Sequence, residues 1–157
     1  MIYNIPEYKV TCIRDATVTS PTLDTPELIY SMWKETVETS AAYQEEKECL
    51  VVFLLNTRKK LKGFNIVGIG TLNQILVEPR EVFRPAIIAA ASSIILAHNH
   101  PSGDPTPSEA DIKVTRDLIR AGQILKIELL DHIVIGKQSE QQTKPFCSLR
   151  ELGYFYS

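Results

Sequence analysis

The run CLVVFLLN, residues 49–56, constrains the fold more than any other segment, because its apolar and β-branched residues continue without polar alternation. Such a run predicts a buried strand inside a covered sheet. The segment TRKKLKG (57–63) predicts a turn, and FNIVGIGTL (64–72) predicts a second strand. Further on, SIILAHNH (93–100) predicts a short strand, and residues 124–136 predict one or two more. The chain is therefore expected to build a β-sheet.

Helical segments alternate with these strands and lie at residues 22–37, 78–92, 109–121 and 148–153. Asp24 or Thr25 is expected to cap the first helix. The third helix is predicted to start after Ser108 and to end at Gly122, as helices often end at glycine. The last helix opens with a capping-box pattern that begins at Ser148. This alternation, with no internal repeat, predicts an α/β or α+β fold with one mixed sheet.

Composition narrows the class of protein. The 157 residues carry a net charge of −2, which argues against a dedicated nucleic-acid binder, since such proteins usually present a basic face. One local exception is the basic cluster of Arg58, Lys59, Lys60 and Lys62. The three cysteines form no Cys-x-x-Cys pair, so neither a zinc ribbon nor a disulfide framework is indicated. Without a signal peptide or a membrane-spanning apolar run, the chain is expected to be cytoplasmic and away from membranes.

The stretch HNHPSGDPTPSEAD, residues 98–111, contains two of the three histidines. Side chains two apart in an extended segment point the same way, so His98 and His100 present two imidazoles to one side while Asn99 points away. The glycine and prolines that follow favour a sharp return of the chain, which would bring Asp111 beside the histidines. Three protein ligands leave the fourth zinc position open for water, which is the catalytic arrangement.

Plainer interpretations of the same residues stay open. Ser108-x-x-Asp111 has the spacing of a capping box, in which Asp111 is a cap partner rather than a ligand. His132, the remaining histidine, leaves three options: a fourth ligand that would close the site, an outer partner of the ligands, or a packed strand residue bonded to Asp131. A structural role or that of an outer partner is favoured.

The pattern HNHP, then six residues, then SEAD resembles the metal-binding motif of the JAMM (MPN+) metalloproteases, His-x-His-Pro-x6-Ser-x2-Asp. The segments GIGTLN, VEPREVF and LLDHIVIG make the chain similar to the RadC branch of that superfamily. The resemblance implies an MPN/JAB-like mixed sheet flanked by helices, with cytidine-deaminase-like architecture. It implies a short member with a single domain, residues 1–157, in which residues 1–47 form an N-terminal extension and a first helix packed on the domain. The helix-hairpin-helix region of many RadC proteins is not expected.

The resemblance also implies roles for individual residues. His98, His100 and Asp111 match the family's three zinc ligands, and Ser108 matches the serine that hydrogen-bonds the developing oxyanion. The family's general base is a glutamate that precedes an early strand. Glu48 is preferred for this role because it directly precedes CLVVFLLN, with Glu45 and Glu46 as alternatives. Asn56, where the family usually has aspartate, is expected to be neutral for the site.

These residues predict a zinc-dependent hydrolase, with one Zn²⁺ ion or Mn²⁺ in its place. Its metal-bound water would be activated by a glutamate to cleave a peptide or isopeptide bond. The alternative is a metal-dependent nuclease or DNA-binding protein of DNA repair, in which the basic cluster and Arg80, Arg84 and Arg116 could guide a nucleic-acid backbone. A binding module without catalysis is disfavoured, because every expected ligand is present. The partner is therefore a peptide or isopeptide substrate or DNA, and a homodimer is left open.

Overall fold

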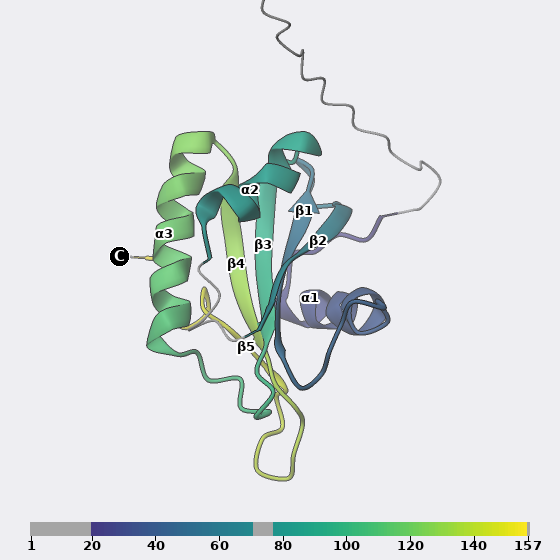
Figure 1. Ribbon diagram of the computed structural model, residues 1–157. Coiled ribbons are helices and arrows are strands. Elements are labelled where there is room, and N and C mark those ends of the chain that lie inside the picture. Colours follow the sequence, from purple (N-terminus) through teal and green to yellow (C-terminus); the bar gives the residue numbers. More distant parts are fainter. Residues whose placement is uncertain (1–19, 71–76, 157) are drawn as a thin grey trace, which may run out of the picture.

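The computed structural model describes residues 20–70 and 77–156, which form a five-stranded sheet with helices on both faces (Figure 1). The strands are β1 (Glu48–Leu55), β2 (Leu61–Gly70), β3 (Ser93–Asn99), β4 (Glu128–Ile135) and β5 (Phe146–Ser148). Their order is β2-β1-β3-β4-β5. β3 and β4 run parallel, and the other neighbouring pairs are antiparallel. The predicted mixed sheet flanked by helices is confirmed.

The helices cover the two faces of the sheet in separate layers. α1 (Pro26–Met32) continues as a π-helix, η1 (Trp33–Val37), and packs on one face. α2 (Pro79–Ile88) and α3 (Glu109–Leu125) pack on the other face. Of the two predicted caps of the first helix, Thr25 is the one used, since its Oγ1 accepts a bond from Leu28 N at 3.3 Å.

The position of the central strand β1 explains why its sequence is apolar throughout. Val51 and Phe53 face the layer that contains Trp33, and Leu50 and Val52 face the layer of α2 and α3. Every residue of β1 after Glu48 is buried. A strand between two helical layers has no solvent-facing side, so polar alternation would leave unpaired polar groups in the core.

The prediction that the third helix ends at Gly122 is wrong. α3 continues to Leu125, and Lys126 closes it in the left-handed conformation with φ of 58°. A methyl group on Gly122 would collide with the carbonyl oxygen of Ile127. The glycine therefore permits the close return of the chain into β4 and does not mark the end of the helix.

The predicted last helix at residues 148–153 is also wrong. Residues 146–148 form β5 beside β4, and turns follow from residue 149 to residue 155. The hydroxyl of Ser148 accepts a bond from Glu151 N at 3.0 Å, as in the predicted capping box, but it donates to Asp131 Oδ2 at 2.7 Å. This buried bond and the pairing with β4 hold Ser148 in the sheet.

Smaller differences lie at the ends of elements. α2 ends at Ile88 rather than at residue 92, because Ala90 adopts a positive φ of 49° in the turn toward β3. β2 begins at Leu61, before the predicted residue 64, so Lys62 belongs to the strand. Residues 71–72 of the predicted second strand lie outside the described residues. Residues 124–136 give one strand, since the first two belong to α3.

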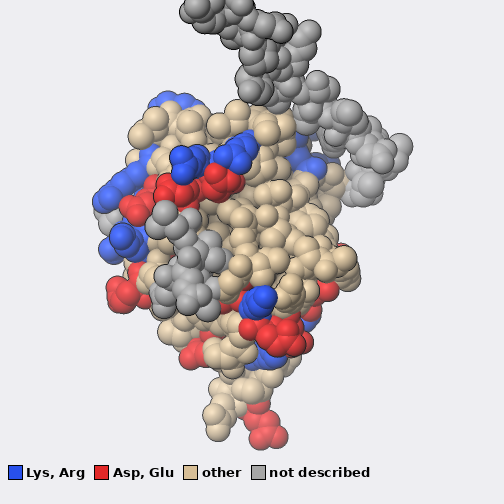
Figure 2. Space-filling view, viewed as in Figure 1, with Lys and Arg blue, Asp and Glu red and all other residues tan. Residues whose placement is uncertain are grey.

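The basic cluster lies partly on the exposed turn between β1 and β2, as predicted for Arg58, Lys59 and Lys60. Asn56 shapes this turn, because its Oδ1 accepts bonds from Arg58 N at 2.9 Å and Lys60 N at 3.0 Å. On the face seen in Figure 2, basic and acidic side chains lie side by side. Among the described residues, every helix is too short or too polar to cross a membrane.

Candidate metal centre

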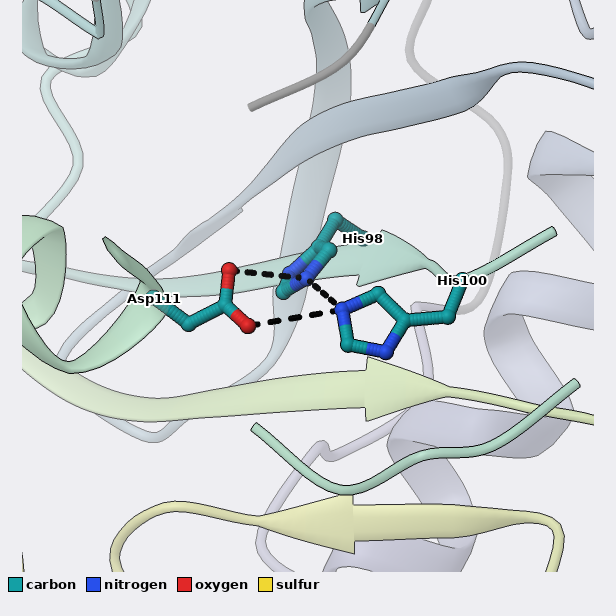
Figure 3. A group of neighbouring side chains, drawn as sticks. All are labelled: His98, His100 and Asp111. Atoms are coloured by element: carbon teal, nitrogen blue, oxygen red, sulfur yellow. Dashed lines mark hydrogen bonds and ion pairs between the residues drawn. The ribbon is translucent and has the colours of Figure 1, made fainter. Parts of the chain in front are cut away.

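Two histidines and an aspartate meet where β3 ends and α3 begins (Figure 3). Nε2 of His98 lies 3.0 Å from Nε2 of His100 and 3.2 Å from Oδ1 of Asp111. Nε2 of His100 lies 3.4 Å from Oδ2 of Asp111. Potential ligand atoms of the three residues fall within 4.8 Å of one another. Imidazole nitrogens and carboxylate oxygens are zinc ligands, so the group could hold a metal ion.

The loop of residues 100–107 brings Asp111 to the histidines, as the prolines and glycine predict. Gly103 N donates to the carbonyl of His100 at 2.9 Å, and Gly103 takes a φ of 88°, which glycine adopts without strain. A side chain on Gly136 would collide with the Gly103 carbonyl oxygen. The loop therefore lies directly against the end of β4, and α3 starts beside β3.

Asp111 takes part in the predicted capping box and in the histidine group together. Its Oδ2 accepts a bond from Ser108 N at 2.7 Å, and Ser108 Oγ accepts one from Asp111 N at 3.2 Å. Its Oδ1 is buried, and no donor among the described residues forms a hydrogen bond with it. Buried carboxylate oxygens are nearly always hydrogen-bonded. This oxygen faces the imidazole of His98, and the other carboxylate oxygen faces that of His100, which suits a cation held between the three side chains.

In its neutral form, His100 presents an unprotonated nitrogen to this group. Its Nδ1 lies 2.8 Å from the backbone oxygen of Asp104, and a carbonyl oxygen can only accept, so Nδ1 carries the hydrogen. In neutral His100 the lone pair of Nε2 then faces His98 and Asp111. Metal-binding histidines are commonly oriented by such a bond from the other ring nitrogen. Sequence reasoning missed Asp104 because its contribution is a backbone carbonyl, for which no side-chain signal exists.

The charges of the group shift several pKa values. Burial alone would raise the pKa of Asp111, but contacts with His100 and His98 hold it well below its usual range, so the carboxylate is ionised. Burial would lower the pKa of His100, but the bonds to Asp111 and to the Asp104 carbonyl outweigh it and raise the pKa. Complete burial lowers the pKa of His132 well below its ordinary value, so this imidazole is neutral.

Glu48, the predicted general base, is the first residue of β1 and is half-buried. Leu50 pairs with His98 across β1 and β3, so Glu48, two residues earlier, lies on the same face of the sheet as His98. The charge of Glu48 contributes to the raised pKa of His100. The glutamate therefore lies within electrostatic reach of the candidate ligands.

Asn99, between the two histidines, points to the opposite side, as predicted. Its Oδ1 accepts a bond from Cys49 N at 2.7 Å, and its Nδ2 donates to the carbonyl of Lys47 at 3.0 Å. These two bonds hold the backbone on both sides of Glu48.

The two other candidate glutamates are placed differently. Glu45 forms an ion pair with Lys137 at 2.6 Å, and this hydrogen bond lowers the pKa of Glu45. Glu46 is exposed on the turn before β1. These positions favour Glu48 over both alternatives.

His132 lies outside the group of possible ligands, next to it in the core. Its Nε2 is 2.8 Å from Nδ1 of His98, and its Nδ1 is 2.7 Å from Oγ1 of Thr115. This arrangement fits the option of an outer partner, and the backbone N of His132 also bonds Asp131 Oδ1 at 2.7 Å. Sequence reasoning missed Thr115, although its position one helical turn after Asp111 places both on one face of α3.

A pocket of about 580 Å³ opens beside His100 on the side of α1. Its lining includes the strand ends at Asn99 and Ile135 together with Tyr30 and Tyr43. Among the three candidate ligands, His100 borders this pocket, and its side chain is 14% exposed while His98 is fully buried.

The model of the RadC-like JAB domain matches residues 23–154 of this chain. The chain belongs to this family. The match covers all the candidate site residues described above, from Glu48 to His132.

Related proteins share about half of their aligned residues with the chain. A UPF0758 protein of Caldanaerobacter subterraneus is 50% identical over 109 residues, which are 69% of this chain and 44% of the relative. A UPF0758 protein of Moorella thermoacetica is 58% identical over 82 residues, 52% of this chain and 36% of the relative. A UPF0758 protein of Geobacillus thermodenitrificans is 50% identical over 108 residues, which are 69% of this chain and 45% of the relative. The chain thus spans less than half the length of these relatives.

Proposed function

We propose that the protein is a zinc-dependent hydrolase of peptide or isopeptide bonds, with His98, His100 and Asp111 as the metal ligands. The observation that carries the proposal is the buried Oδ1 of Asp111, which lacks a hydrogen-bond donor and lies 3.2 Å from Nε2 of His98. The RadC-like JAB domain is consistent with this chemistry. A divalent ion held there would supply a Lewis acid and an activated water.

The protein's own side chains supply the remaining groups for amide hydrolysis. The carboxylate of Glu48 accepts a proton from the attacking water and donates it to the leaving amine. The hydroxyl of Ser108 donates a hydrogen bond to the developing oxyanion. Its capping role does not conflict with this, because the cap uses an oxygen lone pair of Ser108 and leaves the hydroxyl hydrogen available.

The position of the basic cluster weighs against the nuclease alternative. Glu48 and Leu55 are opposite ends of β1, so the turn with Arg58 lies about 20 Å or more from the candidate metal group. Phosphodiester hydrolysis often uses two metal ions, and one group of suitable ligands is found among residues 20–70 and 77–156. The basic turn would therefore not hold a nucleic-acid backbone at the reacting centre.

The test combines metal analysis with a broad search for substrates. Zinc-loaded protein is incubated with a mixture of cellular peptides, with isopeptide-linked peptides and with single-stranded and duplex DNA, and new termini are identified by mass spectrometry and electrophoresis. Glu48→Gln should keep its zinc and lose about 100-fold or more in turnover. Glu46→Gln, a neighbouring exposed glutamate, is the matched control and should remain fully active.

Three outcomes would change the proposal. If the wild-type protein retains no zinc or manganese, the proposed metal centre is wrong. If the turnover of Glu48→Gln is unchanged, Glu48 is not the general base. If the protein cleaves DNA and this cleavage depends on Glu48, the bond that it hydrolyses is a phosphodiester rather than an amide. The cytoplasmic location, the single-domain boundaries and a homodimer stay predictions.

A further inference from the structure

A chain of buried hydrogen bonds connects the metal group to its surroundings. Thr115 Oγ1 lies 2.7 Å from the backbone oxygen of Asp111 and 2.7 Å from Nδ1 of His132. Nε2 of His132 lies 2.8 Å from Nδ1 of His98. The side chains of Thr115, His132 and His98 belong to residues with no exposed surface. Water therefore does not compete for these bonds, and the hydrogens must be divided among the protein groups themselves.

The positions of the hydrogens follow from counting donors and acceptors. Thr115 has one hydroxyl hydrogen, and the carbonyl oxygen of Asp111 can only accept, so at 2.7 Å the hydroxyl donates to that carbonyl. The short contact with His132 then requires Nδ1–H of His132 to donate to Thr115. A neutral His132 that carries its hydrogen on Nδ1 has a lone pair on Nε2, which can only accept.

His98 is therefore the donor in the last bond, from its Nδ1 to His132 Nε2. The other nitrogen of a neutral His98, Nε2, is left without a hydrogen and faces His100 and Asp111. This is the tautomer that binds a metal through Nε2. The reverse direction would place the hydrogen on Nε2 of His98, 3.2 Å from Oδ1 of Asp111, and would leave this nitrogen without the lone pair that a metal needs.

We propose that Thr115 and His132 are positioning residues that hold His98 in its metal-binding tautomer through this relay. The inference rests on the proposed metal centre. The relay begins at the backbone of Asp111 and ends at the ring of His98, so it connects two of the candidate ligands, one on α3 and one on β3. Because every group in the relay between them is neutral, it orients His98 without adding negative charge near the metal.

Two pairs of variants of the full chain separate hydrogen bonding from packing. Thr115→Val removes the hydroxyl at constant shape, and Thr115→Ser keeps it. His132→Leu removes the acceptor, and His132→Gln restores an acceptor near the position of Nε2. Zinc affinity is measured by chelator competition, folding by circular dichroism, and the His98 tautomer by ¹⁵N chemical shifts in metal-free protein.

Thr115→Val and His132→Leu should weaken zinc binding about 10- to 100-fold, whereas the Ser and Gln variants should stay close to wild type. In Thr115→Val the Nε2–H tautomer of His98 should become populated. Wild-type affinity and an unchanged tautomer in both disruptive variants would overturn the relay, as would equal losses in Thr115→Val and Thr115→Ser. If His132→Leu fails to fold, the comparison of Thr115→Val with Thr115→Ser tests the relay by itself. Wild-type protein that binds no zinc but has the expected His98 tautomer would contradict the proposed function alone.

Discussion

Two buried aspartates of this domain, Asp111 and Asp131, are satisfied in different ways. Each oxygen of Asp131 accepts at least one bond: Oδ1 from His132 N at 2.7 Å and Arg150 N at 3.2 Å, and Oδ2 from Ser148 Oγ at 2.7 Å. Asp111 has a donor for Oδ2, but Oδ1 has no donor among the described residues. The carboxylate of Asp131 joins segments of the chain, whereas that of Asp111 faces two imidazoles in a group that could hold a metal ion.

The pKa values of the two groups shift in opposite directions. Burial raises the pKa of Asp131, and its hydrogen bonds offset this only in part. Contacts with the two histidines outweigh burial at Asp111 and lower its pKa. The surrounding residues thus favour a negative charge at Asp111 and disfavour one at Asp131, although both are buried.

Metal content provides the largest expected difference between the two aspartates. Asp111→Asn should lose its metal almost completely, because the proposed third ligand loses its charge. Asp131→Asn should retain about one ion per chain, since no ligand is changed. Elemental analysis after dialysis measures both. Full metal in the Asp111 variant would contradict the ligand assignment, and loss from the Asp131 variant would show that β4 indirectly maintains the site.

In the metal-free protein the order of the two aspartates should be reversed, with the larger loss of stability in the Asp131 variant. Asp131→Ala leaves three donors without their acceptor, so the free energy of unfolding should fall by about 3 kcal/mol or more. Asp111→Ala loses its part of the capping box, which costs about 1 kcal/mol. Urea unfolding followed by circular dichroism compares them. Equal losses would mean that Asp111 also has a mainly structural role.

A substitution directly after β4, where the chain contacts the loop of residues 100–107, tests whether the site depends on how that loop is packed. In Gly136→Ala the new methyl group collides with the Gly103 carbonyl, which should lower the free energy of unfolding by about 1–3 kcal/mol and weaken zinc binding. Gly63→Ala is the control, because no atom lies within 4 Å of the added carbon. Unfolding and chelator competition measure both effects. Wild-type behaviour of Gly136→Ala would show that the loop can move without disturbing Asp111.

The smallest effect is the pH dependence of stability in the metal-free protein. The pKa of Asp131 is raised, so its contribution is fully present below the unfolded value of about 3.8 and decreases as the pH rises through the raised value. The pKa of Asp111 is lowered, so its contribution is present above about 3.8 and decreases as the pH falls. Urea unfolding between pH 3 and 7 should give differences from wild type with opposite slopes for the two asparagine variants. Parallel slopes would contradict the assigned directions.

The sequence predicts local structure well where strand geometry alone determines which way the side chains point. The apolar run of β1 and the two-residue spacing of His98 and His100 both depend on strand geometry alone, and both predictions agree with the structure. The end of α3 was missed, because Gly122 and an interior glycine needed for packing look alike in a sequence. The bond between Thr115 and His132 could not be predicted, since it requires α3 to cover β4.

The side chain of Asn99 determines how the parts of the site are joined. This residue lies between two candidate ligands, yet its amide bonds the backbone about fifty positions earlier, on both sides of Glu48. Any movement of the end of β3 would therefore carry the start of β1 with it. The spacing between Glu48, the proposed proton acceptor, and the candidate metal ligands therefore depends on this amide as well as on the pairing of Leu50 with His98.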